Sequence, residues 1–184
     1  MLFFRILTLV IISSVTAACA STPPCQDLTA WYEFTETEFC FPKESVVRLN
    51  HLNLSEPGAE IEFNPSVMEG SFSVSFIRQS DESGLSELSG RFNKSVPDFL
   101  INLDENSYSD SDWQLISSVL RLESNTMIKR FGSNDTPIVA IIHHPEPLSS
   151  IYILTSGTDS HILLAGELTE SQVEWLVPQL SEFV

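Results

Sequence analysis

The sequence predicts an α+β fold in which an antiparallel β-sheet, arranged as a meander, has two helices packed against it. Three observations predict this class. Residues 71–77 alternate apolar side chains with serines, which is the period-two pattern of a strand with one buried face. Two capping-box sequences, at 111–114 and 169–172, each precede an apolar stripe with helical spacing. Short turn-forming segments separate the strands of the second half, and short turns join antiparallel neighbours.

The first half of the chain is predicted to be mostly β-structure. The segment 71–77 has Phe72, Val74 and Phe76 on one face. The segment 81–89 is polar, rich in Ser and Glu and contains Gly84, so it predicts an exposed loop or a short irregular turn. Strands are expected at 37–41, 45–49, 59–63, 71–77 and 99–103.

The second half is predicted to hold both helices. The first begins near Ser111, ends near 124–125 and carries an apolar stripe that includes Leu115 and Ile116. The second follows the capping box at 169–172, and Pro178 is expected to kink or shorten it. Four strands are expected between the helices, at 126–131, 138–143, 151–155 and 162–166.

The N-terminal residues 1–18 have the features of an export signal peptide. Arg5 lies in a short first region, the apolar run 6–12 follows, and small residues close the segment. This run is shorter than the roughly 20 residues that a membrane-spanning helix needs. The signal therefore predicts processing and export.

The residues around the expected cleavage site resemble the lipobox of bacterial lipoproteins. Thr16-Ala17-Ala18-Cys19 matches its pattern of small residues before a cysteine, although Thr16 stands where the family prefers leucine. The resemblance implies that Cys19 is lipidated, that 19–26 form a tether, and that Ala20 directs the protein to the outer membrane, facing the periplasm. The alternative is cleavage after Ala20, which would release a soluble secreted protein.

The cysteine count is odd, with Cys19, Cys25 and Cys40. Lipidation or removal of Cys19 leaves an even pair, so the sequence predicts a disulfide bond between Cys25 and Cys40. Such a bond would close a loop of about 16 residues and stabilise the fold by roughly 3 kcal/mol in the chain-entropy model. Two buried free thiols are the alternative.

Length and charge limit the classes of function. The chain has 184 residues and is 42% apolar, which predicts one domain over residues 27–184.

Acidic residues outnumber basic ones 25 to 9, for a net charge of −16, and this argues against a nucleic-acid partner or an anionic lipid surface. A protein partner with a basic surface would be attracted, and Glu60 and Glu62 are the predicted binding residues. The alternative is that the acidity serves solubility alone.

The order of elements resembles the Mog1/PsbP-like fold, which several bacterial periplasmic lipoproteins carry. A strand with a proline after it at 38–42, a central helix, a β-meander and a closing helix that ends at 178–183 carry the resemblance. It implies an accessory or binding protein.

Sequence signatures of catalysis and metal binding are missing. The chain has no G-x-S-x-G, S-x-x-K, H-E-x-x-H or phosphate-loop motif. His143 and His144 are adjacent where a predicted strand meets a turn, and neighbouring strand side chains point to opposite faces. Solvated edge or turn histidines are therefore favoured over a metal site that His161 or Glu146 would complete. The acidic segment 104–112 lacks the EF-hand glycine and final glutamate, and predicts a solvated loop at a helix start. No catalytic residue, metal or cofactor is therefore predicted.

These observations predict a non-catalytic periplasmic lipoprotein that acts by binding another protein. An immunity protein that neutralises an antibacterial effector is the most specific version, because it needs export, small size and acidity but no active site. An accessory or assembly lipoprotein of an envelope secretion or pilus machine is the alternative. A hydrolase with an unrecognised site is the third hypothesis.

Overall fold

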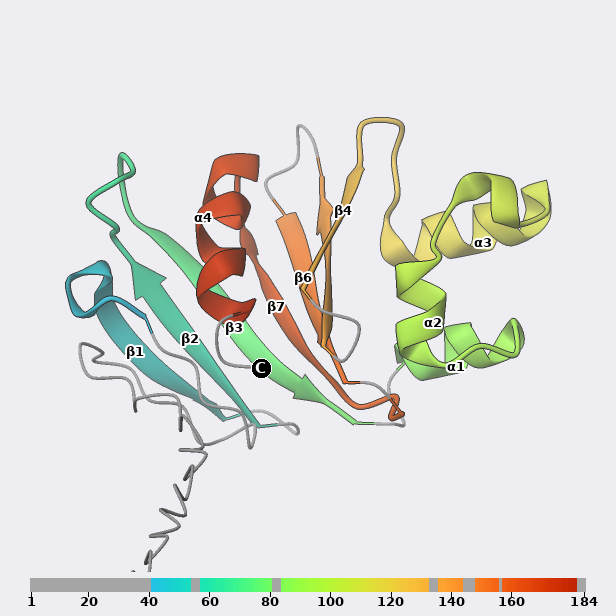
Figure 1. Cartoon of the computed structure of the whole chain (residues 1–184), viewed down its shortest axis with the longest axis horizontal. Helices are drawn as coiled ribbons and strands as arrows, with labels where there is room; N and C mark the ends of the chain where they lie inside the picture. Colours follow the sequence, from blue (N-terminus) through green and yellow to red (C-terminus); the bar gives the residue numbers. More distant parts are fainter. Residues whose placement is uncertain are drawn as a thin grey trace, which may run out of the picture.

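The computed structural model describes residues 41–53, 57–80, 84–132, 136–143, 148–155 and 157–181. Within these ranges the chain forms seven strands, four α-helices and two short 3-10 helices (Figure 1). The strands are β1 (Val46–Asn53), β2 (Pro57–Phe63), β3 (Phe72–Gln79), β4 (Met127–Gly132), β5 (Pro137–Ile142), β6 (Leu148–Leu154) and β7 (His161–Glu167). The helices are η1 (Lys43–Ser45), α1 (Gly84–Arg91), α2 (Val96–Ile101), η2 (Glu105–Ser107), α3 (Asp110–Leu120) and α4 (Glu170–Ser181).

Several predictions fall outside the described residues. They are the signal peptide at 1–18, the tether at 19–26, residues 37–40 of the first predicted strand, and all three cysteines, Cys19, Cys25 and Cys40. Lipidation of Cys19 and the bond between Cys25 and Cys40 therefore stay predictions.

The seven strands form one antiparallel sheet in the order β1-β2-β3-β7-β6-β5-β4. It consists of two meanders, β1-β2-β3 and β4-β5-β6-β7, joined where β3 pairs with β7. The prediction of an antiparallel sheet is confirmed, but the strands do not follow one another in a single meander. Helices α1 to α3 separate β3 from β4, and the chain returns to β3 only with its last strand.

Two segments predicted as a loop and a strand are helices. Helix α1 occupies most of the segment 81–89, and α2 replaces the strand expected at 99–103. Ser95 caps α2, because its Oγ accepts a hydrogen bond from the backbone N–H of Asp98 at 3.2 Å. The described residues thus contain four α-helices, and the prediction of two helices packed on the sheet is not confirmed.

Both predicted helices are present, with changed ends. Helix α3 begins after Ser109, whose Oγ accepts from the backbone N–H of Asp112, so its capping residues precede the expected 111–114 box. It ends before Arg121, whose backbone lies in the left-handed region at φ 54° and ψ 40°. The capping box of α4 is confirmed, since Thr169 N–H donates to Gln172 Oε1 at 2.8 Å and Gln172 N–H donates to Thr169 Oγ1. Pro178 lies inside α4 and does not end it.

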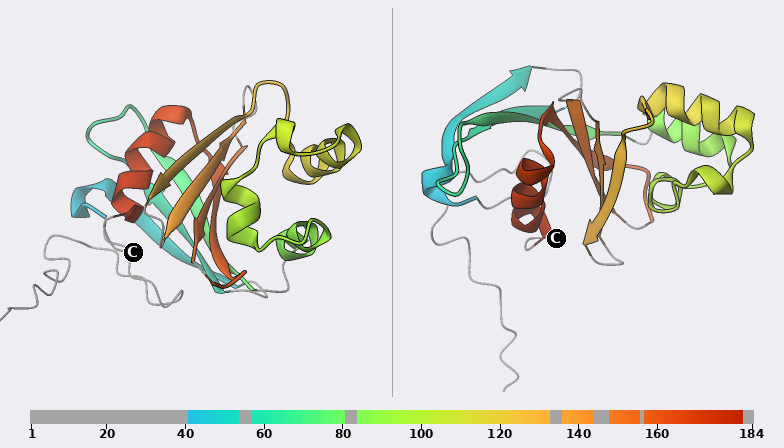
Figure 2. Two further views of the ribbon diagram at one scale, coloured as in Figure 1. Left: turned by 45° about the vertical axis from the view of Figure 1, so that its right-hand side comes forward. Right: turned by 90° about the horizontal axis from the view of Figure 1, so that it is seen from above.

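The sheet is curved, and its two faces carry different helices. Figure 2 shows α4 inside the curve, on the concave face, and α1 to α3 outside it, on the convex face beside β4 to β7. All described helices are short, and none is long and apolar enough to cross a membrane.

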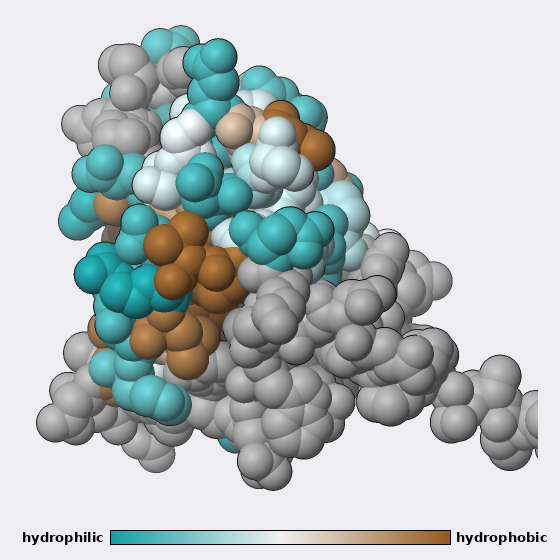
Figure 3. Space-filling view, turned by 90° about the vertical axis from the view of Figure 1, so that its left-hand side faces the viewer, coloured by the Kyte–Doolittle hydropathy of each residue, from teal (hydrophilic) through white to brown (hydrophobic). Residues whose placement is uncertain are grey.

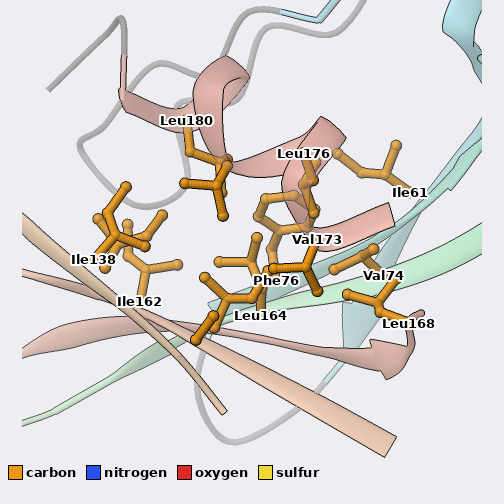
Figure 4. Packing of buried hydrophobic residues seen from close by; sticks show 14 of the residues in the cluster. Ile61, Val74, Phe76, Ile138, Ile162, Leu164, Leu168, Val173, Leu176 and Leu180 are labelled. Atoms are coloured by element: carbon orange, nitrogen blue, oxygen red, sulfur yellow. The ribbon is translucent and has the colours of Figure 1, made fainter. Parts of the chain in front are cut away.

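Alternating strand residues build one core on each face. The concave core packs Phe76 and Leu164 of the sheet against Val173 and Leu176 of α4 (Figure 4). The convex core packs strand residues such as Val139 against Phe99 of α2 and Ile116 of α3. Strand β5 supplies both cores, which explains its continuous apolar sequence.

Two adjacent residues of the edge strand β4 connect the helices to the sheet. Lys129 Nζ donates to the carboxylates of Glu170 and Glu174 on α4, at 2.5 and 2.6 Å, and these hydrogen bonds raise the pKa of Lys129. Arg130 points to the other face, where Nε donates to the carbonyl of Ile101 and Nη2 to that of Leu103. Strand β4 is thus hydrogen-bonded to α4 on one face of the sheet and to the end of α2 on the other.

Candidate functional site

The convex face of β1, β2 and β3 carries a polar surface over which no described helix packs (Figure 2). Strand register brings its side chains together in two rows across the strands. Residues between them, such as Ile61 and Val74, point into the concave core. We call this surface the open face, and it consists of Arg48, Asn50, Glu60, Glu62, Ser73 and Ser75.

Both predicted binding residues, Glu60 and Glu62, lie on the open face and each has a partner on β1. Arg48 Nη2 is 3.1 Å from Glu62 Oε2, and the Glu62 side chain is only 25% exposed. Asn50 Nδ2 donates to Glu60 Oε2 at 3.1 Å. One of the two negative charges is therefore balanced by Arg48. Reasoning from the sequence missed Arg48 and Asn50, because only the β1–β2 register shows that they stand opposite the glutamates.

Apolar side chains reach the surface along β1, which lies at the edge of the sheet among the described strands. Val47 is 57% exposed and Leu49 is 37% exposed. The pairing with β2 is irregular between Val46 and Arg48, which leaves Val47 without a partner residue in the register. Figure 3, viewed from the β1 side, shows apolar surface bordered by hydrophilic residues.

A pocket of about 280 Å³ lies where α3 ends, between the turn to β4 and the neighbouring ends of β5 and β6. Its wall combines opposite charges, hydroxyl groups, an imidazole and two leucines. Thr126 Oγ1 accepts from the backbone N–H of Glu123 at 2.8 Å and lies 3.4 Å from His143 Nδ1. We call it the α3 pocket, and it is lined by Ser117, Ser118, Arg121, Leu122, Glu123, Thr126, His143 and Leu148.

No motif or pattern in the sequence indicated the α3 pocket. His143 was predicted to be a turn histidine, and it does follow the end of β5. Arg121 and Glu123 were expected inside the first helix, but that helix ends before them. Only the packing of the end of α3 beside the ends of β5 and β6 brings these groups together.

The remaining metal-binding hypotheses gain no ligand set. His161 is buried, and its Nδ1 is 2.9 Å from the carbonyl oxygen of Asp159, while His144 and Glu146 lie outside the described residues. Among the residues that the structure describes, no three His, Cys, Asp or Glu side chains are grouped so as to hold a metal ion.

The acidic segment 104–112 is largely exposed and supplies helix caps, as predicted for the start of a helix, but it is only partly a loop, because 105–107 form η2 and 110–112 begin α3. Asp104 Oδ1 accepts from the backbone N–H and the side chain of Asn106, and these hydrogen bonds lower the pKa of Asp104. Asp110 and Asp112 lie in the first turn of α3, where negative charge stabilises a helix.

The structure thus offers two candidate sites, the open face with Glu60 and Glu62, and the α3 pocket with Arg121, Glu123 and His143. No protein-family model, no curated protein and no solved structure matches the chain.

Proposed function

We propose that this chain is an exported lipoprotein that acts by binding another protein, and specifically an immunity protein that neutralises an antibacterial effector. The open face carries this proposal. It is a polar sheet surface with carboxylates in its centre, and no described helix packs over it. Hydrogen bonds and ion pairs to such a surface would orient a partner.

Charge specifies the kind of partner. The net charge of −16 attracts a basic protein over distances of about one Debye length, roughly 8 Å at physiological salt. Arg48 is the one positive charge among the six residues of the open face, and it is already paired with Glu62. A partner that presents Lys or Arg side chains would meet Glu60 directly and Glu62 in competition with Arg48.

Neutralising the two glutamates is expected to slow association with the partner. A Glu60→Gln/Glu62→Gln variant should lower the association rate about two- to fivefold at low salt, and the difference should shrink as salt rises. The partner is first captured from a periplasmic extract by the immobilised mature protein. Association rates are then measured by surface plasmon resonance at two salt concentrations.

Two matched variants make this experiment specific. Arg48→Gln adds to the negative charge of the same face and should raise the association rate. Glu105→Gln removes one negative charge in η2, against two in the double variant, and should leave the rate nearly unchanged. Equal rates for all variants would contradict the role of the open face. Turnover of an envelope substrate by the pure protein would contradict a binding function.

A lipid anchor at Cys19 is part of the proposal, supported by the lipobox-like residues 16–19. Cells fed a palmitate analogue should label the wild-type protein and should not label a Cys19→Ser variant. Expression of both proteins is checked by immunoblot. If the wild type carries no label while a known lipoprotein in the same cells does, the protein is not lipidated.

The apolar edge strand favours an assembly factor as the second candidate function. An edge strand can pair its backbone with a strand of a client protein, and the exposed Val47 and Leu49 would be covered by that client. Deletion of the gene separates the two functions. Loss of a secreted or pilus protein would indicate the assembly role, whereas killing by a neighbouring producer strain would indicate immunity.

A further inference from the structure

We infer that the α3 pocket binds a free α-amino acid with an apolar side chain. This inference does not rest on the proposed protein partner, because the pocket and the open face are built from different residues. The volume of about 280 Å³ lies near the lower end of small-molecule pockets, which run from roughly 300 to 1,000 Å³. The pocket therefore suits a ligand smaller than a nucleotide.

The charges in the pocket complement a zwitterion. Arg121 and Glu123 are two residues apart in the chain and both line the pocket. In the part of the chain that the structure describes, neither side chain forms an ion pair or a hydrogen bond. A ligand carboxylate would pair with the Arg121 guanidinium, and a ligand ammonium with the Glu123 carboxylate. An amino acid carries both groups on one carbon.

The backbone at Arg121 supports a role for its side chain. Arg121 adopts φ 54° at the position after α3, where the left-handed conformation favours glycine. An arginine in this conformation has a conformational cost that a glycine would not have. Such strain is concentrated at binding sites, where it is part of how the site is built.

Hydrogen bonds hold the wall of the pocket in place before a ligand binds. Thr126 links the α3–β4 turn to the end of β5, since its Oγ1 accepts from Glu123 N–H and lies 3.4 Å from His143 Nδ1. On the helix side, Ser118 Oγ donates to the carbonyl of Leu115, and its oxygen can still accept a hydrogen bond. A wall fixed in this way lowers the entropic cost of binding.

The leucines decide which amino acids fit. Leu122 and Leu148 line the pocket beside the polar groups, and Leu148 is 41% exposed. An aliphatic or aromatic ligand side chain lying on them would remove apolar surface from water. A charged ligand side chain would gain no binding free energy from contact with these leucines. Amino acids such as leucine, methionine and phenylalanine therefore fit the pocket best.

Calorimetric titration of the full mature protein tests the inference with L-leucine, L-methionine and L-phenylalanine as probes. Wild-type protein should bind at least one of them saturably. The decarboxylated and deaminated analogues of that amino acid, each of which lacks one charge, should bind at least tenfold more weakly. Absence of saturable binding with all three amino acids would overturn the inference.

Substitutions separate the site from a general effect on folding. Arg121→Gly should raise the melting temperature, because glycine adopts the left-handed conformation without steric cost. The same variant should still weaken amino-acid binding at least tenfold. Glu123→Gln should weaken binding of the amino acid much more than binding of its deaminated analogue. Arg91→Gln, on α1, removes an exposed arginine outside the pocket and should bind like the wild type. Unchanged affinity in Arg121→Gly would overturn the assignment of this pocket.

Discussion

A Phe76→Ala variant is expected to lose about 3–5 kcal/mol of unfolding free energy. Phe76 is fully buried in the concave core, and its ring centroid lies 6.0 Å from that of Phe41. Its strand, β3, lies inside the sheet, between β2 and β7, so the surrounding side chains have little freedom to close the cavity. Such a loss is a large share of the 5–15 kcal/mol that stabilises a typical domain.

Urea unfolding followed by tryptophan fluorescence measures this loss. Val67→Ala is the control, because Val67 is 73% exposed and its truncation should change stability by about 0.5 kcal/mol or less. A loss below about 1.5 kcal/mol for Phe76→Ala would contradict the tight packing of the concave core.

A Gly166→Ala variant is expected to be destabilised by about 1–3 kcal/mol, although it adds only one methyl group. A Cβ atom at Gly166 would lie 2.5 Å from the backbone oxygen of Ser73 and 3.5 Å from the Cα of Val74. These are backbone atoms of β3, and Gly166 belongs to β7, which pairs with β3, so relief requires the two strands to move apart. The substitution therefore strains the contact between the two meanders.

Gly90→Ala is the matched control, because it is expected to raise the stability of the protein and not to lower it. Gly90 lies in α1, and a Cβ atom there would have no atom within 4 Å besides its chain neighbours and the backbone of its own helix. Alanine should stabilise this helix by roughly 0.5–1 kcal/mol. Thermal unfolding of both variants should show melting temperatures shifted in opposite directions. A shift in the same direction would contradict the close approach of β3 to Gly166.

Strands with one apolar face could be predicted from the sequence, because local alternation records which face is buried. The segment 71–77 overlaps β3, and the regular positions Phe72, Val74 and Phe76 all lie in the concave core. The later strands were also found, within a few residues of their ends, because turn-forming residues separate them. The pairing of β3 with β7 has no local signal, so the order of strands could not be predicted.

Two helices were missed because their local signals were weak or misleading. The α1 sequence contains serines and glycines, which favour loops, and its helix packs through Leu88 in the convex core. The apolar run at 99–103 resembles a buried strand, yet Phe99 and Leu100 are both buried on one helix. The helix start was present in the sequence, since Ser95 and Pro97 are typical of a cap and first turn.

The candidate sites differ in how far the sequence could predict them. Glu60 and Glu62 could be chosen because they alternate with Ile61 on a strand, which places both on the same face. Their partner Arg48 depends on strand register, and the α3 pocket depends on the packing of α3 against the sheet. Such contacts between distant residues leave no pattern in a single sequence.

The pairing of β3 with β7 also bears on when this chain can fold. Gln79 pairs with His161, so the meander β1-β2-β3 keeps an open edge until the last strand of the sheet has been synthesised. Contacts between residues so far apart in the chain form slowly, because a long loop must close first. A growing chain that lacks β7 and α4 also lacks the helix that covers the concave core. Slow completion fits the proposed export, because a translocation channel accepts only an unfolded polypeptide.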